Sequence, residues 1–479
     1  MPHTAKRSAE TTERSPGAAK RSSATAAPLP RGPHSLSREE VLEDQRLRLL
    51  TAMVDAIGEN GYRTTTIADV IERAGVSRKT FYVHFANKQE CFLAAYDAVT
   101  ATGMHWVASA YRDAEGWPDR VEAAIRVLFE SAIENPAAIR LSLIEIGAAG
   151  TEGLKRRERA MSQFERFVRD SLELAPGSGT VPNTVLRGVV GGLNKVLNTY
   201  VREGQRSKLL KLVPDLVSWA TAYYPVPASL LSDRQADRPG GSLRHAGLMG
   251  GRAPGTLFPQ ALSRGRRRLA PGTQNVSRSF VIHSQRERIL DAVANLSAAA
   301  GYTSLTVEDI VGEAAVSLEA FYEHFKSKED AFLVAYELGH VKGLGIVQRA
   351  FSAEEDWRSG VREAIAALLS YLASEPSFAH LALLDTLVAT PLSAERFNKG
   401  VTVYAQMLMP GFEAAPKHLR PPDITIEAIA GALFELCFHY AVQGRIRELP
   451  ELAADATYIA LAPFIGAEGA AQVATEPPD

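Results

Sequence analysis

The feature that most constrains this chain of 479 residues is a repeat, because the sequence matches itself without a gap when it is shifted by 240 positions. Positions 61–96 and 301–336 share 16 of 36 residues. Weaker matches continue at the same offset, such as Trp117 with Trp357. A period of this length is far too long for a solenoid. The chain is therefore predicted to fold as two copies of one unit.

Each copy has the apolar spacing of helices. Apolar residues recur on a helical period ahead of Gly61, at Leu47, Leu50, Val54 and Ile57, and the same pattern precedes Gly301 in the second copy. A glycine directly after such a segment is typical of a helix end. No run of alternating polar and apolar residues is long enough for a sheet. The predicted fold class is all-α.

Composition sets the boundaries between the predicted domains. Residues 1–37 contain few large apolar side chains and six Lys or Arg against two Glu, which predicts a disordered basic tail. Residues 225–280 are rich in Gly and Pro and carry nine Arg against two Asp, which predicts a flexible linker. The expected domains are a first head at 38–100, a first helical body at 101–224, a second head at 281–340, a second body at 341–466 and a disordered tail at 467–479.

Positions 64–85 have the pattern of a helix-turn-helix. Thr66 is placed to cap a first short helix, Gly75 to form the turn, and Ser77 to cap a second helix. This places positive side chains at the exposed start of the second helix, the end that enters the major groove in such motifs. Net charge is only −2, so DNA affinity must come from such local patches. We expect DNA contacts from Thr65, Thr66, Ser77, Arg78, Lys79, Thr80, Tyr82, His84 and Lys88, the last three at backbone phosphates.

The run from Thr66 to Ser77, followed by Phe81-Tyr82, His84-Phe85 and Lys88, resembles the signature of the tetracycline repressor (TetR) family. The resemblance implies about nine helices per copy, with three in the DNA-binding head and the rest in a ligand-binding and dimerisation body. It also implies double-stranded operator DNA and a small effector as partners, usually with repression. The expected pairing helices are about 181–204 and 207–223, and about 422–444 and 447–464. The family forms homodimers, whereas this chain carries two subunits, so an intrachain pseudo-dimer and a homodimer are both open.

The second head differs in charge. Positions 64–90 carry four basic and three acidic residues, whereas positions 304–330 carry two and seven. The exposed Arg78-Lys79-Thr80 becomes Leu318-Glu319-Ala320. Two alternatives follow: this head has lost DNA binding and serves as a scaffold or protein-interaction module, or it reads a different half-site with Glu319 accepting from cytosine. The weaker candidate contacts are Ser317, Glu319, Tyr322, His324 and Lys328.

An internal pocket for an apolar or amphipathic effector is implied by the family resemblance. Its candidate residues are Trp106, Phe129, Phe164, His380, Phe434 and His439. Two cysteines cannot build a disulfide framework or a metal cluster, and Cys91 and Cys437 lie among apolar neighbours, so we expect both to be buried. No metal or cofactor is expected.

Enzymatic and membrane functions have no support in the sequence. It has no glycine-rich phosphate loop, no Gly-x-Ser-x-Gly and no His-Glu-x-x-His. No apolar run approaches the length of a membrane span, and the N-terminus lacks the apolar core of a signal peptide. We therefore expect a cytoplasmic protein that is not an enzyme and has no membrane partner.

Overall fold

The computed structural model describes residues 37–172, 181–224 and 278–476, and every regular element in these ranges is helical. The first copy comprises α1 (Arg38–Asn60), α2 (Ile67–Ala74), α3 (Arg78–His84), α4 (Lys88–Asp113), α5 (Trp117–Glu134), α6 (Pro136–Ile139), a π-helical segment (Arg140–Glu145), a 3-10 turn (Ile146–Ala149), α7 (Gly150–Leu172), α8 (Asn183–Arg202), a 3-10 turn (Arg206–Leu212) and α9 (Val213–Thr221). The expected all-α class and helical order are confirmed.

The second copy repeats this order. It comprises α11 (Arg278–Ala300), α12 (Val307–Ala314), α13 (Leu318–His324), α14 (Lys328–Ala353), α15 (Trp357–Ser374), α16 (Pro376–His380), a π-helical segment (Leu381–Asp385), α17 (Thr386–Val388), α18 (Pro391–Tyr404), α19 (Gly411–Ala414), α20 (Thr425–Val442) and α21 (Ala453–Thr475), with 3-10 turns at Tyr302–Ser304, Ala405–Leu408, Lys417–Leu419 and Ile446–Leu452. The main difference is that α7 is continuous, whereas its counterpart α18 ends at Tyr404.

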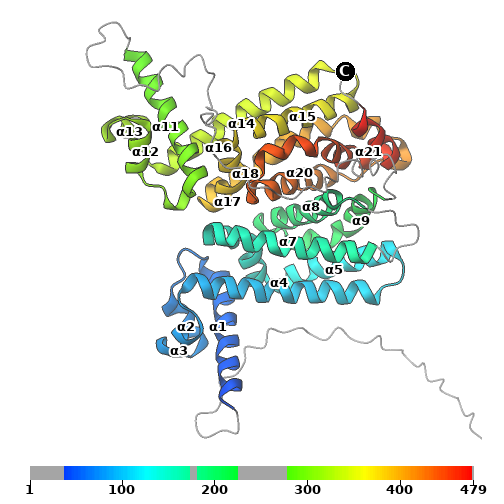
Figure 1. Ribbon diagram of the computed structural model, residues 1–479. Coiled ribbons are helices and arrows are strands. Elements are labelled where there is room, and N and C mark those ends of the chain that lie inside the picture. The colour runs from blue at the N-terminus through cyan, green and yellow to red at the C-terminus, as the bar shows by residue number, and fades with distance from the viewer. Residues whose placement is uncertain (1–36, 173–180, 225–277, 477–479) are drawn as a thin grey trace, which may run out of the picture.

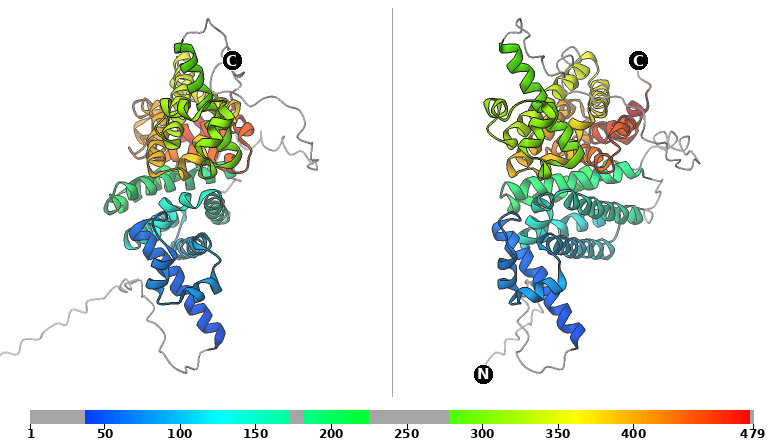
Figure 2. Two further views of the ribbon diagram at one scale, coloured as in Figure 1. Left: turned by 90° about the vertical axis from the view of Figure 1, so that its left-hand side faces the viewer. Right: turned by 60° about the vertical axis from the view of Figure 1, so that its left-hand side comes forward.

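The two copies are related by a pseudo-twofold axis at the crossing of α8 and α20. Gly191 and Gly431 occupy equivalent positions, and they face each other. A Cβ on Gly191 would lie 3.2 Å from the carbonyl oxygen of Gly431, and one on Gly431 would lie 3.0 Å from that of Gly191. A surface that meets its own equivalent defines a twofold interface. Both heads consequently project from the same side of the paired bodies (Figures 1 and 2).

Helix α21 and the residues that follow α9 complete the interface between the copies. The indole of Trp219 is buried against Gly192, and Ile459 packs on Gly188. The hydroxyl of Tyr458 donates to the carbonyl of Tyr223 at 2.8 Å. The four helices are those that the family resemblance implies, and here they pair within one chain. Of the described helices, α20 is the one long and apolar enough for a membrane span, and 67% of it is buried inside the structure.

Some predicted boundaries shift. The C-terminal segment 467–479 was expected to be disordered, but helical backbone resumes after a kink at Gly466 and extends to Thr475, and Ala470, Ala471 and Val473 are buried. Its alanine-rich composition hides this burial because small apolar residues also occur in tails. The second head begins at Arg278, earlier than expected. The predicted N-terminal tail and linker lie outside the described residues, except Ser37 and residues 278–280 at their ends.

Candidate nucleic-acid interface and effector pocket

The first head is built as the sequence predicts. Thr66 and Asp69 form a reciprocal cap at the start of α2, and the hydroxyl of Ser77 accepts from the Thr80 amide at the start of α3. Gly75 has φ 59°, a left-handed conformation that glycine adopts without steric cost. Phe81 and Phe85 are buried between α3 and the other helices of the head. This packing fixes which side of α3 faces outward.

The outward side of α3 is positive and amphipathic. Arg78 and Lys79 are exposed at its first turn, and neither forms an ion pair with a described residue. The guanidinium of Arg78 lies 5.9 Å from the ring centroid of Tyr82, which is 47% exposed. Val83, 62% exposed, extends the same surface. Exposed cations without carboxylate partners beside a protruding tyrosine are the side chains that contact phosphates and base edges in helix-turn-helix proteins.

Besides the capping residues Thr66, Ser77 and Thr80, three predicted DNA contacts have internal partners. Thr65 is only 1% exposed, and its hydroxyl donates to the carbonyl of Gly61 at 2.8 Å. The Lys88 ammonium donates to the carbonyls of Tyr62 at 2.8 Å and Thr65 at 2.9 Å, and burial lowers its pKa. Nε2 of His84 lies 3.4 Å from a side-chain oxygen of Gln45.

These contacts correct the sequence interpretation of Thr65 and Lys88: both fasten the loop between α1 and α2. The sequence contains an indication of this structural role, because Lys88 and Tyr62 recur together as Lys328 and Tyr302. In the second head, the Lys328 ammonium likewise donates to the carbonyl of Tyr302 at 3.2 Å and to that of Leu305 at 2.6 Å. Retention of this lysine in the acidic head therefore follows from packing and does not require phosphate.

The second head keeps the frame and loses the positive surface. Ser317 caps α13 as Ser77 caps α3, and Tyr322 is exposed. Glu319 and Glu323 are exposed on the side of α13 that corresponds to the outward side of α3. His324 is half-buried, and its pKa is lowered first by burial. Ala315 replaces Gly75 and has φ 51°, which crowds its Cβ against the backbone.

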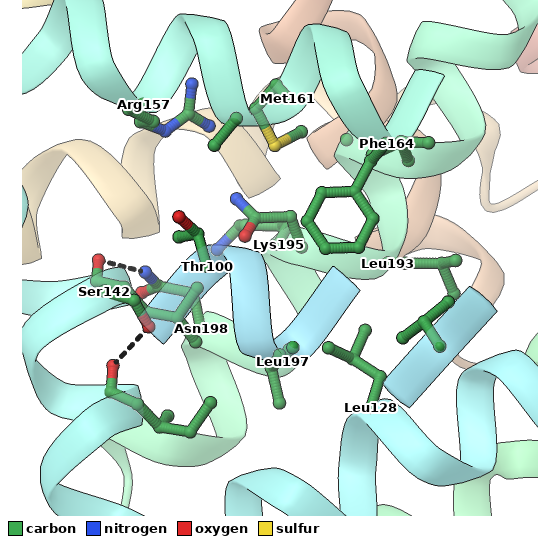
Figure 3. Close-up of a pocket in the computed structure, with 18 of the residues that line it drawn as sticks. Thr100, Leu128, Ser142, Arg157, Met161, Phe164, Leu193, Lys195, Leu197 and Asn198 are labelled. Atoms are coloured by element: carbon green, nitrogen blue, oxygen red, sulfur yellow. Dashed lines mark hydrogen bonds between the residues drawn. The ribbon is translucent and has the colours of Figure 1, made fainter. Parts of the chain in front are cut away.

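A cavity of about 460 Å³ lies in the first body, between α4, α5, α7 and α8. Its apolar end includes Leu128, Met161, Phe164 and Leu193, and its polar end includes Thr100, Ser142 and Asn198 (Figure 3). Lys195 lies in the middle of the view and Arg157 at the upper edge. One apolar and one polar end suit an amphipathic molecule.

The structure separates the predicted pocket residues. Trp106, Phe164 and Phe434 line this cavity, the last from the second copy. Phe129 does not line it because its ring is fully buried in the packed core. His380 is 3.1 Å from a carboxylate oxygen of Asp385, and His439 is 2.6 Å from one of Glu158, so the partners of these histidines are carboxylates, and neither histidine lines the cavity.

The polar groups of the cavity are partly engaged. The Lys195 ammonium donates to the hydroxyl of Thr199 at 3.1 Å and lies 3.7 Å from a carboxylate oxygen of Glu427. Burial lowers the pKa of Lys195, while Glu427 opposes that shift. The amide of Asn198 donates to the carbonyl of Leu143 at 3.1 Å. An acidic or carbonyl-bearing ligand would find donors at this end.

Aromatic side chains occupy the equivalent region of the second copy. Ser131, Ala138 and Thr100 in the first copy correspond to Tyr371, Phe378 and His340 in the second, as the offset of 240 gives. The hydroxyl of Tyr371 donates to the carbonyl of Gly339 at 2.9 Å, and Phe378 packs so closely on Gly339 that a Cβ there would lie 2.1 Å from its ring. These rings fill the volume that small side chains leave open in the first body.

A π-helical segment joins the cavity to the first head. Ser142, Leu143 and Ile144 line the cavity, and the next residue, Glu145, accepts the backbone N–H of Tyr62 at 3.0 Å. π-helical turns are rare and often occur at functional sites.

The same segment carries a second link to the head through Arg140. Its guanidinium donates to the carbonyl of Gly58 at 3.0 Å and to Glu145 at 3.2 Å. A molecule that displaces this segment therefore acts directly on the end of α1 and the loop that follows it.

Metal and thiol chemistry have no candidate site in the described ranges. No group of three or more His, Cys, Asp or Glu residues there could hold a metal ion. Cys91 and Cys437 are both buried and unpaired, as expected, and burial raises the pKa of each thiol to about 12. Such thiols stay protonated and unreactive at neutral pH.

Comparison with known proteins identifies the repeated unit. The family model described as "Bacterial regulatory proteins, tetR family" matches residues 49–95 and again residues 289–335. The HTH-type transcriptional activator FasR of Mycolicibacterium smegmatis is 27% identical over 99 residues, which cover 21% of this chain and 45% of that protein. The HTH-type transcriptional regulator TtgR of Pseudomonas putida is 36% identical over 67 residues, or 14% of this chain and 32% of that protein.

The matches are local at the sequence level. The chain spans about half the length of the first curated relatives it matches. A solved structure of the fatty acid degradation regulator FadR from Bacillus halodurans aligns at 15% identity with a TM-score of 0.34, covering 38% of this chain and 96% of that one. The family model matches once in each predicted head, and the curated relatives are named as HTH-type regulators. The heads of both copies therefore match the tetR family of bacterial regulatory proteins, and the chain is a tandem duplication of a unit similar to that family.

Proposed function

We propose that this chain is a cytoplasmic, non-enzymatic transcriptional regulator, acting as a ligand-responsive repressor, that grips operator DNA mainly through its first head. The observation that carries the proposal is the outward side of α3, where Arg78 and Lys79 are exposed and have no carboxylate partner among the described residues. Arg78 and Lys79 would read base edges in the major groove, and Thr66, Ser77, Thr80, Tyr82 and His84 would orient the head on the backbone.

The second head would contribute little to affinity. Glu319 and Glu323 occupy the surface where the first head presents Lys79 and Val83, and carboxylates near phosphates oppose binding. We therefore propose that it acts as a scaffold that holds the first head in place. A footprint dominated by one half-site follows, in contrast to the symmetric operator of a homodimer.

The effector would be a small amphipathic molecule bound once per chain in the cavity of the first body. Its polar end would accept hydrogen bonds near Asn198 and Lys195, and its apolar end would lie among Phe164, Leu128 and Leu193. Binding would move the π-helical segment that carries Glu145, and with it the loop at Tyr62. That motion would tilt α3 relative to the groove and release DNA.

The experiment selects operators from a randomised duplex pool with the full chain and then measures affinity over a salt series. Arg78→Ala with Lys79→Ala should weaken binding by about 1–3 kcal/mol for each base contact that is lost. The matched control is Lys155→Ala, which removes an exposed lysine of α7 outside both heads. If Glu319→Ala with Glu323→Ala weakens binding more than the change in α3, the first head is not the reader.

A further inference from the structure

The contact between α8 and α20 carries an inversion of charge. Arg187 and Lys195 of α8 correspond to Glu427 and Glu435 of α20. Lys195 lies 3.7 Å from Glu427, and Arg187 lies 3.5 Å from Glu435. The pseudo-twofold axis exchanges these two ion pairs, so one helix supplies both cations and the other supplies both anions.

The inversion determines which helices can pair. If two copies of α8 met with this geometry, Arg187 would face Lys195 twice. If two copies of α20 met, Glu427 would face Glu435 twice. Like charges at such separations repel, and buried charges are poorly screened by solvent and salt. Only the mixed pair of α8 with α20 places opposite charges at both positions.

The anions depend on the other copy for their neutralisation. Glu435 is 1% exposed, and its cation partners among the described residues are Arg187 and Arg157 at 2.6 Å, both from the first copy. A buried carboxylate that lost these partners would remain uncompensated. In a pair of second copies, each Glu435 would be buried without these two cation partners.

The cation at position 187 is fixed in place. Arg187 is held by Glu158 at 3.1 Å and Glu165 at 2.8 Å, both on α7 of its own copy. The hydroxyl of Ser162 accepts a further hydrogen bond from it at 2.9 Å. The guanidinium is therefore held at the interface, where its anionic partner from the second copy is Glu435.

We propose that this charge pattern is a pairing code that joins the first copy to the second copy of the same chain and rejects pairing of like copies. The partner of the α8 surface is thus the acidic α20 surface and not a second α8. The code would make the one-chain pseudo-dimer the functional unit and keep the two heads permanently non-equivalent. This inference rests on the interface alone and holds whether or not the first head binds DNA.

The test is a charge-exchange cycle at the Lys195–Glu427 pair in the full chain. Lys195→Glu and Glu427→Lys each create a like-charge contact, and the double variant restores attraction with reversed polarity. Glu427→Gln is the matched control that removes attraction without adding repulsion. Thermal unfolding and native mass spectrometry report the stability and the number of chains per particle.

The pairing code predicts one chain per wild-type particle. Each repulsive single variant should lower the melting temperature more than Glu427→Gln does, and the double variant should regain more than half of the summed loss. The code is overturned if the double variant loses as much as the two single variants together, or if Glu427→Lys is no worse than Glu427→Gln. A stable two-chain wild-type particle would overturn it as well.

Discussion

Replacing Lys88 by methionine distinguishes a structural role of this lysine from a role in phosphate binding, which the sequence alone does not separate. Methionine keeps the apolar stem and removes the ammonium, which donates to the carbonyls of Tyr62 and Thr65 and lies 4.3 Å from the centroid of the Tyr62 ring. Hydrogen bonds to charged groups contribute about 1.5–3 kcal/mol each. Allowing for solvation of the freed carbonyls and loss of the ring contact, we expect Lys88→Met to destabilise the first head by about 2–4 kcal/mol.

The assay combines urea unfolding with DNA affinity measured over a salt series. A phosphate contact contributes about 0.9 to the slope of log affinity against log salt concentration. Lys88→Met should lower the unfolding free energy and leave that slope unchanged, whereas Arg78→Ala should change stability by less than about 0.5 kcal/mol. Retained stability with a slope reduced by about one unit would show that Lys88 binds phosphate and would refute the structural role assigned to it.

Three further predictions concern other parts of the molecule. Ala315→Gly should stabilise the second head by about 1 kcal/mol in thermal unfolding because it removes a strained left-handed alanine, and a destabilising result would contradict this. Ser131→Tyr should fill the first cavity against Gly103, as Tyr371 does against the equivalent Gly343 in the second copy. This substitution should abolish binding of the dye anilinonaphthalene sulfonate without weakening DNA binding, whereas undiminished dye binding would show that the dye binds elsewhere. Glu145→Ala should speed amide hydrogen exchange at Tyr62 by about tenfold or more through loss of its acceptor, whereas unchanged exchange would mean that this link does not hold the loop.

The fold and the frame of each head follow from local sequence signals. Thr66 and Ser77 cap helices because their hydroxyls accept from backbone amides, and Gly75 turns the chain because it lacks a Cβ. These effects act over a few residues, so the sequence reports them. The repeat adds a second instance of both caps, at Thr306 and Ser317, whereas the glycine of the turn is replaced by Ala315.

The effector pocket could be anticipated only in part. Phe434 lines the first cavity although it belongs to the second copy, which no local pattern encodes. His380 lies in an apolar run like a pocket residue, but its partner is Asp385, on the next turn of a π-helical segment. Side chains with similar sequence surroundings therefore have different roles, because contacts with residues distant in the sequence determine which of them line the cavity.

The interface charges were readable only after the pairing was known. Arg187 and Glu427 are unremarkable helix residues in the sequence, and their meaning appears when the pseudo-twofold axis sets one against Glu435 and the other against Lys195. Likewise, Lys88 resembles a phosphate-binding residue at a helix start until its carbonyl partners are seen. Functional assignment of charged residues thus needs their three-dimensional partners.

Hydroxyl-radical footprinting of the full chain on a selected operator tests the central claim most directly, since it reports which head grips the duplex. Strong protection of one half-site by a single chain, lost in Arg78→Ala with Lys79→Ala, is the predicted pattern. Equal protection of two symmetric half-sites, or protection that survives those substitutions and disappears when Glu319 is changed, would contradict it.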